Sequence, residues 1–109
     1  MVSFPGRDEV WLIRLDPSMG SEIKKTRPCL VVSPDEMNES LQTVLVAPMT
    51  TTLRNYPTRI TVTFRGKTGQ VALDQIRAAD RARLVRRLGV IPARAARETS
   101  NVLREMFAR

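Results

Sequence analysis

The sequence has no histidine, a single cysteine and no long apolar run among its 109 residues. One cysteine, Cys29, excludes an intrachain disulfide. Without histidine the usual nitrogen and sulfur ligands of zinc are nearly absent, so we expect no metal site and no cofactor. The lack of imidazole also removes the side chain most often used for proton transfer near neutral pH. Any enzymatic reaction must therefore depend on other side chains.

No apolar stretch approaches the roughly 20 residues that a membrane-spanning helix needs. The first ten residues, MVSFPGRDEV, lack the basic and apolar parts of a secretory signal. Hydrophobic residues make up 42% of the chain and charged residues 27%, which is typical of a folded globular protein. We therefore expect a single domain over residues 1–109, a cytoplasmic location and no membrane association.

Positive charge is concentrated toward the C-terminus. The net charge is +7, and from Arg77 onward there are nine arginines against three acidic residues. Such a field attracts polyanions, of which nucleic acid is the commonest, although arginine-rich genomes also produce basic proteins without that role.

Short strand patterns dominate the first two thirds of the chain. Residues 9–15 (EVWLIRL) alternate between two faces and end at Asp16-Pro17, since proline cannot donate to a ladder. The other expected strands are residues 29–33, 43–49, 58–64 and 70–73, with a turn or one helical turn at 34–40 and a glycine-containing hairpin connection at 65–69.

The last part of the chain has a helical pattern. Pro92 suits the first turn of a helix, and apolar residues follow it at intervals of three or four. These residues are Ala96, Thr99, Leu103 and Met106/Phe107. We expect Val102, Met106 and Phe107 to pack against the core. The predicted fold class is mainly β: a strongly bent antiparallel sheet or small barrel with a C-terminal α-helix.

Two loops carry groups suited to binding phosphate. GSEIKKTRP (20–28) contains Arg27 just before a strand, and TTTLRNYP (50–57) begins with Thr50 just after one. If the two strands are antiparallel neighbours, Arg27 and Thr50 lie at the same end of the sheet and the loops share one cleft. The fork of an arginine matches phosphate oxygens, and a threonine hydroxyl adds a neutral donor. The pattern predicts a site that binds a phosphodiester.

Further side chains could extend this site. Lys24, Lys25 and Arg54 would add positive charge, and Tyr56 could stack on an unpaired base. In the alternative interpretation the two lysines are solvated loop charges and Tyr56 is half-buried.

Several motifs along nearly the whole chain form a specific combination. They are DP, GSE and TRP within WLIRLDPSMGSEIKKTRPCLVVS, then VLVAPMTTT and NYPTRI, and finally DQIR within GQVALDQIRAADRARL. Together they resemble the MazF/PemK family of toxin endoribonucleases from bacterial toxin-antitoxin pairs. The resemblance implies an SH3-like barrel, a homodimer, a cognate antitoxin in the same groove and metal-independent cleavage of single-stranded RNA. It also implies attack by the substrate's own 2′-hydroxyl, which leaves a 2′,3′-cyclic phosphate and a 5′-hydroxyl.

The resemblance carries catalytic roles onto this sequence. The family's essential arginine falls on Arg27, which would neutralise charge on the phosphorane, and its essential threonine falls on Thr50, which would orient the scissile phosphate. Arginine is a poor base, so Glu22 is the better candidate for taking the 2′ proton. Glu22 could instead neutralise Lys24 or Arg27 and hold the loop in shape.

The acidic position implicated in some family members aligns with Asp74. The arginine two residues before it in those members is Ala72 here, and their first-loop histidine is Ser21, which weakens Asp74 as a catalyst. We expect Asp74 to order Gln75 and Arg77 or to help close the cleft.

The candidate RNA-binding residues extend over both loops and beyond. They are Ser21, Lys24, Lys25, Thr51, Thr52, Arg54, Tyr56, Asp74, Gln75 and Arg77. Arg77 would contact RNA or pair with Asp80. Two other functions remain open: a toxin of the same fold that poisons DNA gyrase, and a non-catalytic RNA-binding barrel. Both predict no cleavage products.

Overall fold

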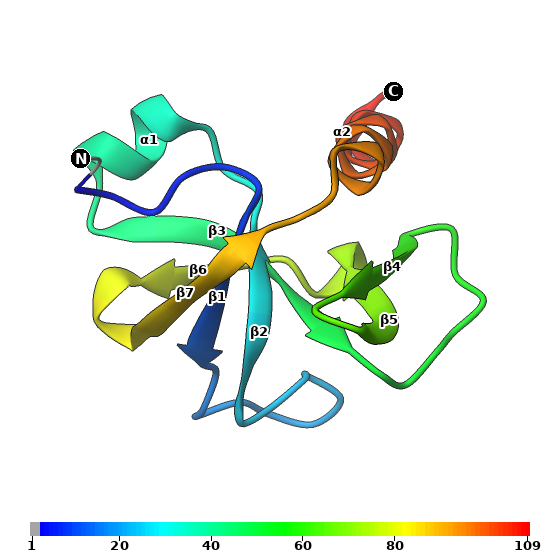
Figure 1. Ribbon diagram of the computed structural model, residues 1–109, viewed down its shortest axis with the longest axis horizontal. Coiled ribbons are helices and arrows are strands. Elements are labelled where there is room, and N and C mark those ends of the chain that lie inside the picture. The colour runs from blue at the N-terminus through cyan, green and yellow to red at the C-terminus, as the bar shows by residue number, and fades with distance from the viewer. Residues whose placement is uncertain (1–2) are drawn as a thin grey trace.

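A curled antiparallel sheet and one long helix make up most of the computed structural model, which describes residues 3–109 (Figure 1). The strands are β1 (Glu9–Arg14), β2 (Thr26–Val31), β3 (Thr43–Thr50), β4 (Arg59–Phe64), β5 (Lys67–Ala72), β6 (Arg77–Asp80) and β7 (Leu84–Val90). The helices are α1 (Asp35–Ser40) and α2 (Ala93–Phe107), with 3-10 turns η1 (Leu73–Gln75) and η2 (Arg81–Arg83). The mainly β prediction is confirmed, whereas the assignment of residues 1–109 to a single domain stays a prediction.

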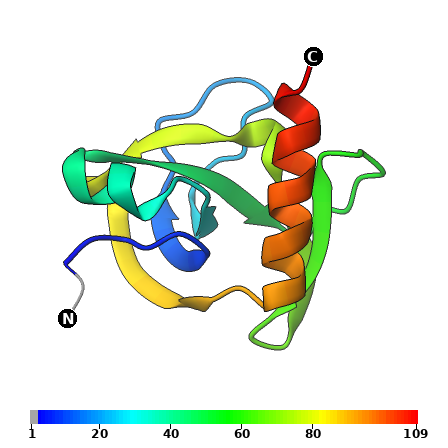
Figure 2. The same ribbon diagram turned by 90° about the horizontal axis from the view of Figure 1, so that it is seen from above.

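The strands follow the order β4-β5-β3-β2-β1-β7 in the sheet. Strand β6 is outside this order and pairs with β3. Every pairing is antiparallel. The sheet curls into half of a barrel, with α2 across its open side next to β4 (Figure 2). Within residues 3–109, no helix is long and apolar enough to cross a membrane.

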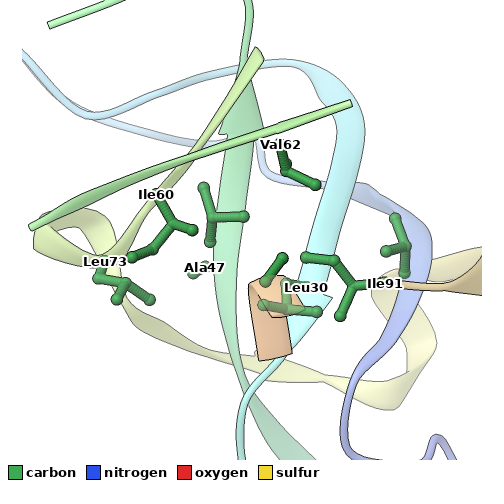
Figure 3. Packing of buried hydrophobic residues seen from close by; sticks show 9 residues of the cluster. Leu30, Ala47, Ile60, Val62, Leu73 and Ile91 are labelled. Atoms are coloured by element: carbon green, nitrogen blue, oxygen red, sulfur yellow. The ribbon is translucent and has the colours of Figure 1, made fainter. Parts of the chain in front are cut away.

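The central strands β2 and β3 are buried on both faces. Leu30 and Ala47 belong to the cluster inside the curl, shown in Figure 3 together with Ile60, Val62, Leu73 and Ile91. Cys29, Val31, Val44 and Val46 belong to a second cluster. Successive side chains of a strand point to opposite faces, so a strand covered on both sides needs a continuous apolar run. These two strands therefore form a rigid frame whose ends bear the neighbouring loops.

Strand β2 begins earlier than the sequence predicts. Its first residues pair with β1, with Arg14 opposite Thr26 and Ile13 opposite Arg27. Arg27 is therefore a strand residue and not a loop residue, which fixes its backbone. The hairpin between β4 and β5 turns at Arg65 and Gly66, whose φ angles of 51° and 78° allow a tight two-residue connection.

Strands β6 and β7 are absent from the sequence prediction. Their sequences, RAAD and LVRRLGV, are rich in arginine and do not alternate cleanly, and most of β7 is exposed or only partly buried. Their strand conformation follows from pairing with β3 and β1, a tertiary influence that local patterns do not reveal.

Helix α2 confirms the predicted C-terminal helix, with Pro92 at its N-cap. Val102, Leu103 and Met106 pack against the inner cluster as expected. Phe107 does not, because it lies in the last turn and is 74% exposed. The expectation that Phe107 packs against the core is therefore wrong.

Candidate functional site

Arg27 and Thr50 lie at the same end of the β2-β3 pair. Cys29 is opposite Pro48 in this antiparallel ladder, and continuing the register brings Arg27 opposite Thr50. The predicted pairing of the two strands is thus confirmed. Both residues line a cleft of about 560 Å³ between the β1-β2 loop (residues 15–25) and the β3-β4 loop (residues 51–58).

Most of the candidate residues named from the sequence line this cleft. They are Ser21, Glu22, Arg27, Thr50, Thr51, Thr52, Arg54, Tyr56, Asp74 and Gln75. Ile23 and Arg59 line it too, although the sequence analysis did not single them out. Lys24, Lys25 and Arg77 are not part of the lining. The two lysines are exposed on the β1-β2 loop.

The guanidinium of Arg27 is oriented by the β1-β2 loop that precedes its strand. Its Nε donates a hydrogen bond to the carbonyl of Lys24 at 2.9 Å. Among residues 3–109, Arg27 forms no ion pair, and neither of its Nη atoms takes part in a hydrogen bond. The two Nη groups can therefore donate to an anion that enters the cleft.

The hydroxyl of Thr50 is also oriented. Its Oγ1 accepts a hydrogen bond from the backbone N–H of Thr52 at 3.1 Å. A hydroxyl that accepts there keeps its own proton for donation elsewhere. Thr50 is only 9% exposed, so this donor sits in the floor of the cleft beside Arg27.

Gly69 on β5 approaches the backbone of Thr50. A Cβ atom at position 69 would lie 2.7 Å from the carbonyl oxygen of Thr50, closer than real contacts allow. Any side chain at this position would therefore displace Thr50. The sequence predicts Gly69 in the hairpin connection, whereas the turn is made by Arg65 and Gly66 and Gly69 lies within β5.

Gln70 holds the middle of the β3-β4 loop. Its side chain is buried, and its Oε1 accepts from the backbone N–H of Arg54 at 2.9 Å while its Nε2 donates to the carbonyl of Arg54 at 3.1 Å. These bonds satisfy backbone groups that a loop would otherwise leave to water. Gln70 is not predicted as a site residue from the sequence, and the signal for it was a polar amide directly before the apolar Val71 and Ala72 of β5.

Glu22 closes a turn at the tip of the β1-β2 loop. Its Oε1 accepts from the N–H of Met19 at 2.6 Å, and its own N–H donates to the carbonyl of Met19 at 3.0 Å. Gly20, with a φ of 57°, allows this tight turn. The expected ion pair of Glu22 with Lys24 or Arg27 is not formed, because the carboxylate is drawn to the backbone instead.

Asp74 is bound by Arg59 from the neighbouring strand. Its two carboxylate oxygens accept from Nε and Nη2 of Arg59 at 2.7 Å and 3.0 Å, and Oδ1 also accepts from Thr58 Oγ1 at 3.1 Å. The hydrogen bonds from Arg59 hold the pKa of Asp74 below its ordinary value. Asp74 does line the cleft, but the expectation that it orders Gln75 and Arg77 is wrong.

Gln75 and Arg77 support the β1-β2 loop. The Oε1 of Gln75 accepts from the N–H of Ile23 at 3.3 Å. Arg77 Nη1 donates to the carbonyl of Leu15 at 3.0 Å and to Ser18 Oγ at 3.3 Å.

Arg77 does not pair with Asp80, as the sequence suggested it could. Asp80 Oδ1 accepts from the N–H of Ala82 at 2.8 Å and so caps η2. The guanidinium of Arg77 is used within the protein, at the start of the β1-β2 loop.

A family model for the "PemK-like, MazF-like toxin of type II toxin-antitoxin system" matches residues 6–107. The chain belongs to this family.

Two curated relatives named as endoribonucleases match this chain over different lengths. The protein is 32% identical over 97 residues to endoribonuclease MazF9 of Mycobacterium tuberculosis, covering 80% of this chain and 82% of that protein. It is 43% identical to endoribonuclease PemK of Escherichia coli over 44 residues, 40% of this chain and 33% of PemK.

Solved structures of this family share the fold. MazF of Deinococcus radiodurans (Form-I) matches with a TM-score of 0.86 and 26% identity, covering 99% of this chain and 100% of that one. A MazE-MazF structure from the same organism (Form-I) matches with a TM-score of 0.74 and 27% identity over the same shares of the two chains.

Other reactive groups of this family member lie outside the cleft. Cys29 is buried in β2, and burial raises the pKa of its thiol to about 12. Across residues 3–109, no three acidic or cysteine side chains gather closely enough to hold a metal ion.

Proposed function

We propose that the protein is an endoribonuclease toxin that cleaves single-stranded RNA and thereby inhibits translation and growth. The observation that carries this proposal is the cleft in which Arg27 and Thr50 each keep a donor unengaged. Membership of the toxin family and relatives named as endoribonucleases support it.

The proposed reaction is a transfer of the phosphodiester within the substrate. The 2′-oxygen of one nucleotide attacks the adjacent phosphorus and loses its proton. The bond from phosphorus to the 5′-oxygen of the next nucleotide breaks, and that oxygen takes up a proton. The products are a 2′,3′-cyclic phosphate and a 5′-hydroxyl, and the atoms balance without water, oxidant or metal.

Arg27 and Thr50 act on the phosphate in this reaction. The two Nη groups of Arg27 neutralise the charge that develops on the non-bridging oxygens, and the Thr50 hydroxyl donates to one of those oxygens and orients the group. Arg27 can also supply the proton that the leaving 5′-oxygen needs.

Glu22 is the carboxylate better suited to accept the 2′ proton. Asp74 has both oxygens engaged by Arg59, and its lowered pKa makes it a weaker base. Glu22 has one oxygen bonded to Met19, and no hydrogen bond within residues 3–109 involves its Oε2. Glu22→Gln keeps an oxygen for Met19 but cannot accept a proton. It should therefore lower kcat.

The remaining candidates would guide the RNA, and we propose partners as well. Lys24 and Lys25 would attract the approaching strand electrostatically. The partners are a cognate antitoxin that occupies the cleft and a second copy of the chain, in the cytoplasm. The MazE-MazF structure that matches this chain supports the antitoxin. The exposed Val85 and Val90 of β7 are apolar surface that a second copy could cover.

The testing experiment incubates purified wild-type and Arg27→Ala protein with a long single-stranded RNA in EDTA and maps the product ends. We expect wild-type cleavage that leaves 2′,3′-cyclic phosphates and is lost in the folded variant. No cleavage by folded wild type on varied RNAs would overturn the proposal and favour a gyrase poison or a non-catalytic RNA-binding barrel. Cleavage only after divalent metal is added would overturn the metal-independent route.

A further inference from the structure

Tyr56 is the one aromatic residue in the lining of the cleft, and the guanidinium of Arg59 packs against one face of its ring. It lies on the β3-β4 loop and is 49% exposed. The guanidinium carbon of Arg59 lies 5.0 Å from the centroid of the ring. Arg59 N–H also donates to the carbonyl of Tyr56 at 3.1 Å, so backbone and side chain of Arg59 both hold this residue.

Arg59 is itself fixed. The side chain is only 7% exposed, and Asp74 accepts from it through both carboxylate oxygens. The register between β4 and β5 explains the contact between Arg59 and Asp74. Arg59 is opposite Ala72, and Asp74 follows Ala72 by two residues. Since this bidentate pairing neutralises the guanidinium and uses its Nε edge, Arg59 is unsuited to compete with Arg27 for the phosphate.

From this arrangement we propose that Arg59 and Asp74 are positioning residues that hold Tyr56 as a stacking platform for an unpaired base next to the scissile phosphate. The inference rests on the proposed ribonuclease function. One face of the ring lies against Arg59, and the other is left for a base. A cation over one face of an aromatic ring binds it without covering the other.

Holding Tyr56 in one orientation helps binding because an exposed ring otherwise loses conformational entropy when a base stacks on it. Residues 51–57 are all exposed, so few packing contacts restrict the loop. Stacking of a base on an aromatic side chain is sequence-tolerant by itself, because every base has a flat face. A ring held in one orientation can hold the base at a fixed distance from the phosphate, and selectivity then depends on the fit of that base.

The ion pair also stays charged over a wide pH range. Hydrogen bonds from Arg59 lower the pKa of Asp74, and those from Asp74 raise the pKa of Arg59. Asp74 with its lowered pKa retains its support for Arg59 until the pH falls through that value.

The test measures cleavage of RNA oligonucleotides in which each base of the cut motif is varied in turn. Arg59→Met keeps the apolar stem and removes the guanidinium, and Asp74→Asn releases it. We expect each to lower kcat/KM about tenfold, chiefly through KM, and to weaken discrimination at one position of the motif. Tyr56→Phe keeps the ring and should therefore keep the discrimination at that position, which Tyr56→Ala should lose.

Non-additivity separates positioning from general damage. If Arg59 acts through Tyr56, the double variant Tyr56→Ala/Arg59→Met is no worse than Tyr56→Ala alone. Arg94→Met is the matched control, because it removes the arginine of another ion pair, an exposed one on α2. Folding of every variant is checked by circular dichroism and Tm. If Arg59→Met does not fold, the Asp74→Asn variant is used in its place to test the positioning role.

Several outcomes would overturn the inference while leaving the ribonuclease in place. These are unchanged selectivity in folded Arg59→Met and Asp74→Asn, or losses that multiply in the double variant. Binding can be measured without chemistry on an RNA with a 2′-deoxy sugar at the cleavage site and 2-aminopurine in the motif. We expect its fluorescence to be quenched by wild type and Tyr56→Phe but not by Tyr56→Ala. Quenching that survives in Tyr56→Ala would overturn the platform.

Discussion

The two loops that wall the cleft are held in different ways. The β1-β2 loop is fastened at its start by Arg77 and near its end by Gln75, while its tip is held only by its own turn between Met19 and Glu22. The β3-β4 loop is fastened at the beginning by Thr50, in the middle by Gln70 and at the end by Arg59.

This difference indicates which substitutions should change the shape of each loop. In both loops, side chains from other elements of the fold accept from or donate to backbone groups of the loop, which leaves the loop's own side chains for a ligand. The β1-β2 loop can lose one fastening and keep the shape of its tip. The β3-β4 loop has no turn around Arg54 comparable to that tip. If the bonds from Gln70 to Arg54 are lost, we expect the loop to move and to displace Thr50, the residue that precedes it.

The largest expected effect comes from Arg27, the second residue of β2, next to the β1-β2 loop. Arg27→Lys keeps the charge but loses the two-pronged donor, and we expect RNA cleavage to fall by about a thousandfold. Single-turnover rates on a cleavable oligonucleotide measure this. Arg94→Lys serves as the control, and full activity of Arg27→Lys would remove Arg27 from the centre of the reaction.

The matching position at the other loop is Thr50, with a smaller expected effect. Thr50→Val removes the hydroxyl with little change in shape, and we expect a loss of about a hundredfold in kcat, the usual cost of one donor to a developing oxyanion. Thr50→Ser keeps the hydroxyl and should keep most of the activity. Equal rates for the Val and Ser variants would show that the hydroxyl is not used.

A pair of anchor substitutions tests the comparison directly. Gln70→Leu removes both bonds to Arg54, and we expect it to lower stability by about 2 kcal/mol and cleavage by about tenfold. Arg77→Met removes the anchor of the β1-β2 loop, and we expect a loss of about 1 kcal/mol with cleavage within about threefold. Chemical denaturation and initial rates measure both. A larger cleavage loss in Arg77→Met than in Gln70→Leu would reverse the comparison.

The smallest expected effect is at Cys29, which lies in the frame that both loops share. Its thiol is buried with a pKa of about 12, so at neutral pH it is a small apolar group and not a nucleophile. Cys29→Val should cleave RNA within about twofold of wild type. A folded Cys29→Val protein without activity would reveal a role for the thiol.

Much of the frame could be predicted from the sequence because its strands have strong local patterns. The continuous apolar runs around Leu30 and Val46 and the alternation from Arg59 to Phe64 identify buried strands without tertiary information. Strands β6 and β7 have no such pattern, and only their pairing partners reveal them.

The residues that line the cleft could be predicted from the sequence, but their hydrogen-bond and ion-pair partners could not. The ends of adjacent strands predicted that Arg27 and Thr50 would meet, and motifs supplied most of the lining. Pairings such as Arg59 with Asp74 depend on the register between β4 and β5, which residue types do not determine. Gln70 was missed for the same reason, since the role of its buried amide becomes clear only when the loop that it holds is in place.

The close approach of Gly69 to Thr50 has a genetic consequence. If the toxin arrests growth, cells that survive its expression carry mutations that inactivate it, and most such mutations act by unfolding the protein. A single added methyl group at position 69 meets the carbonyl oxygen of Thr50 at 2.7 Å. Gly69→Ala is therefore expected among these survivors, because the backbone of Thr50, at the proposed site of cleavage, must shift to make room for the methyl group.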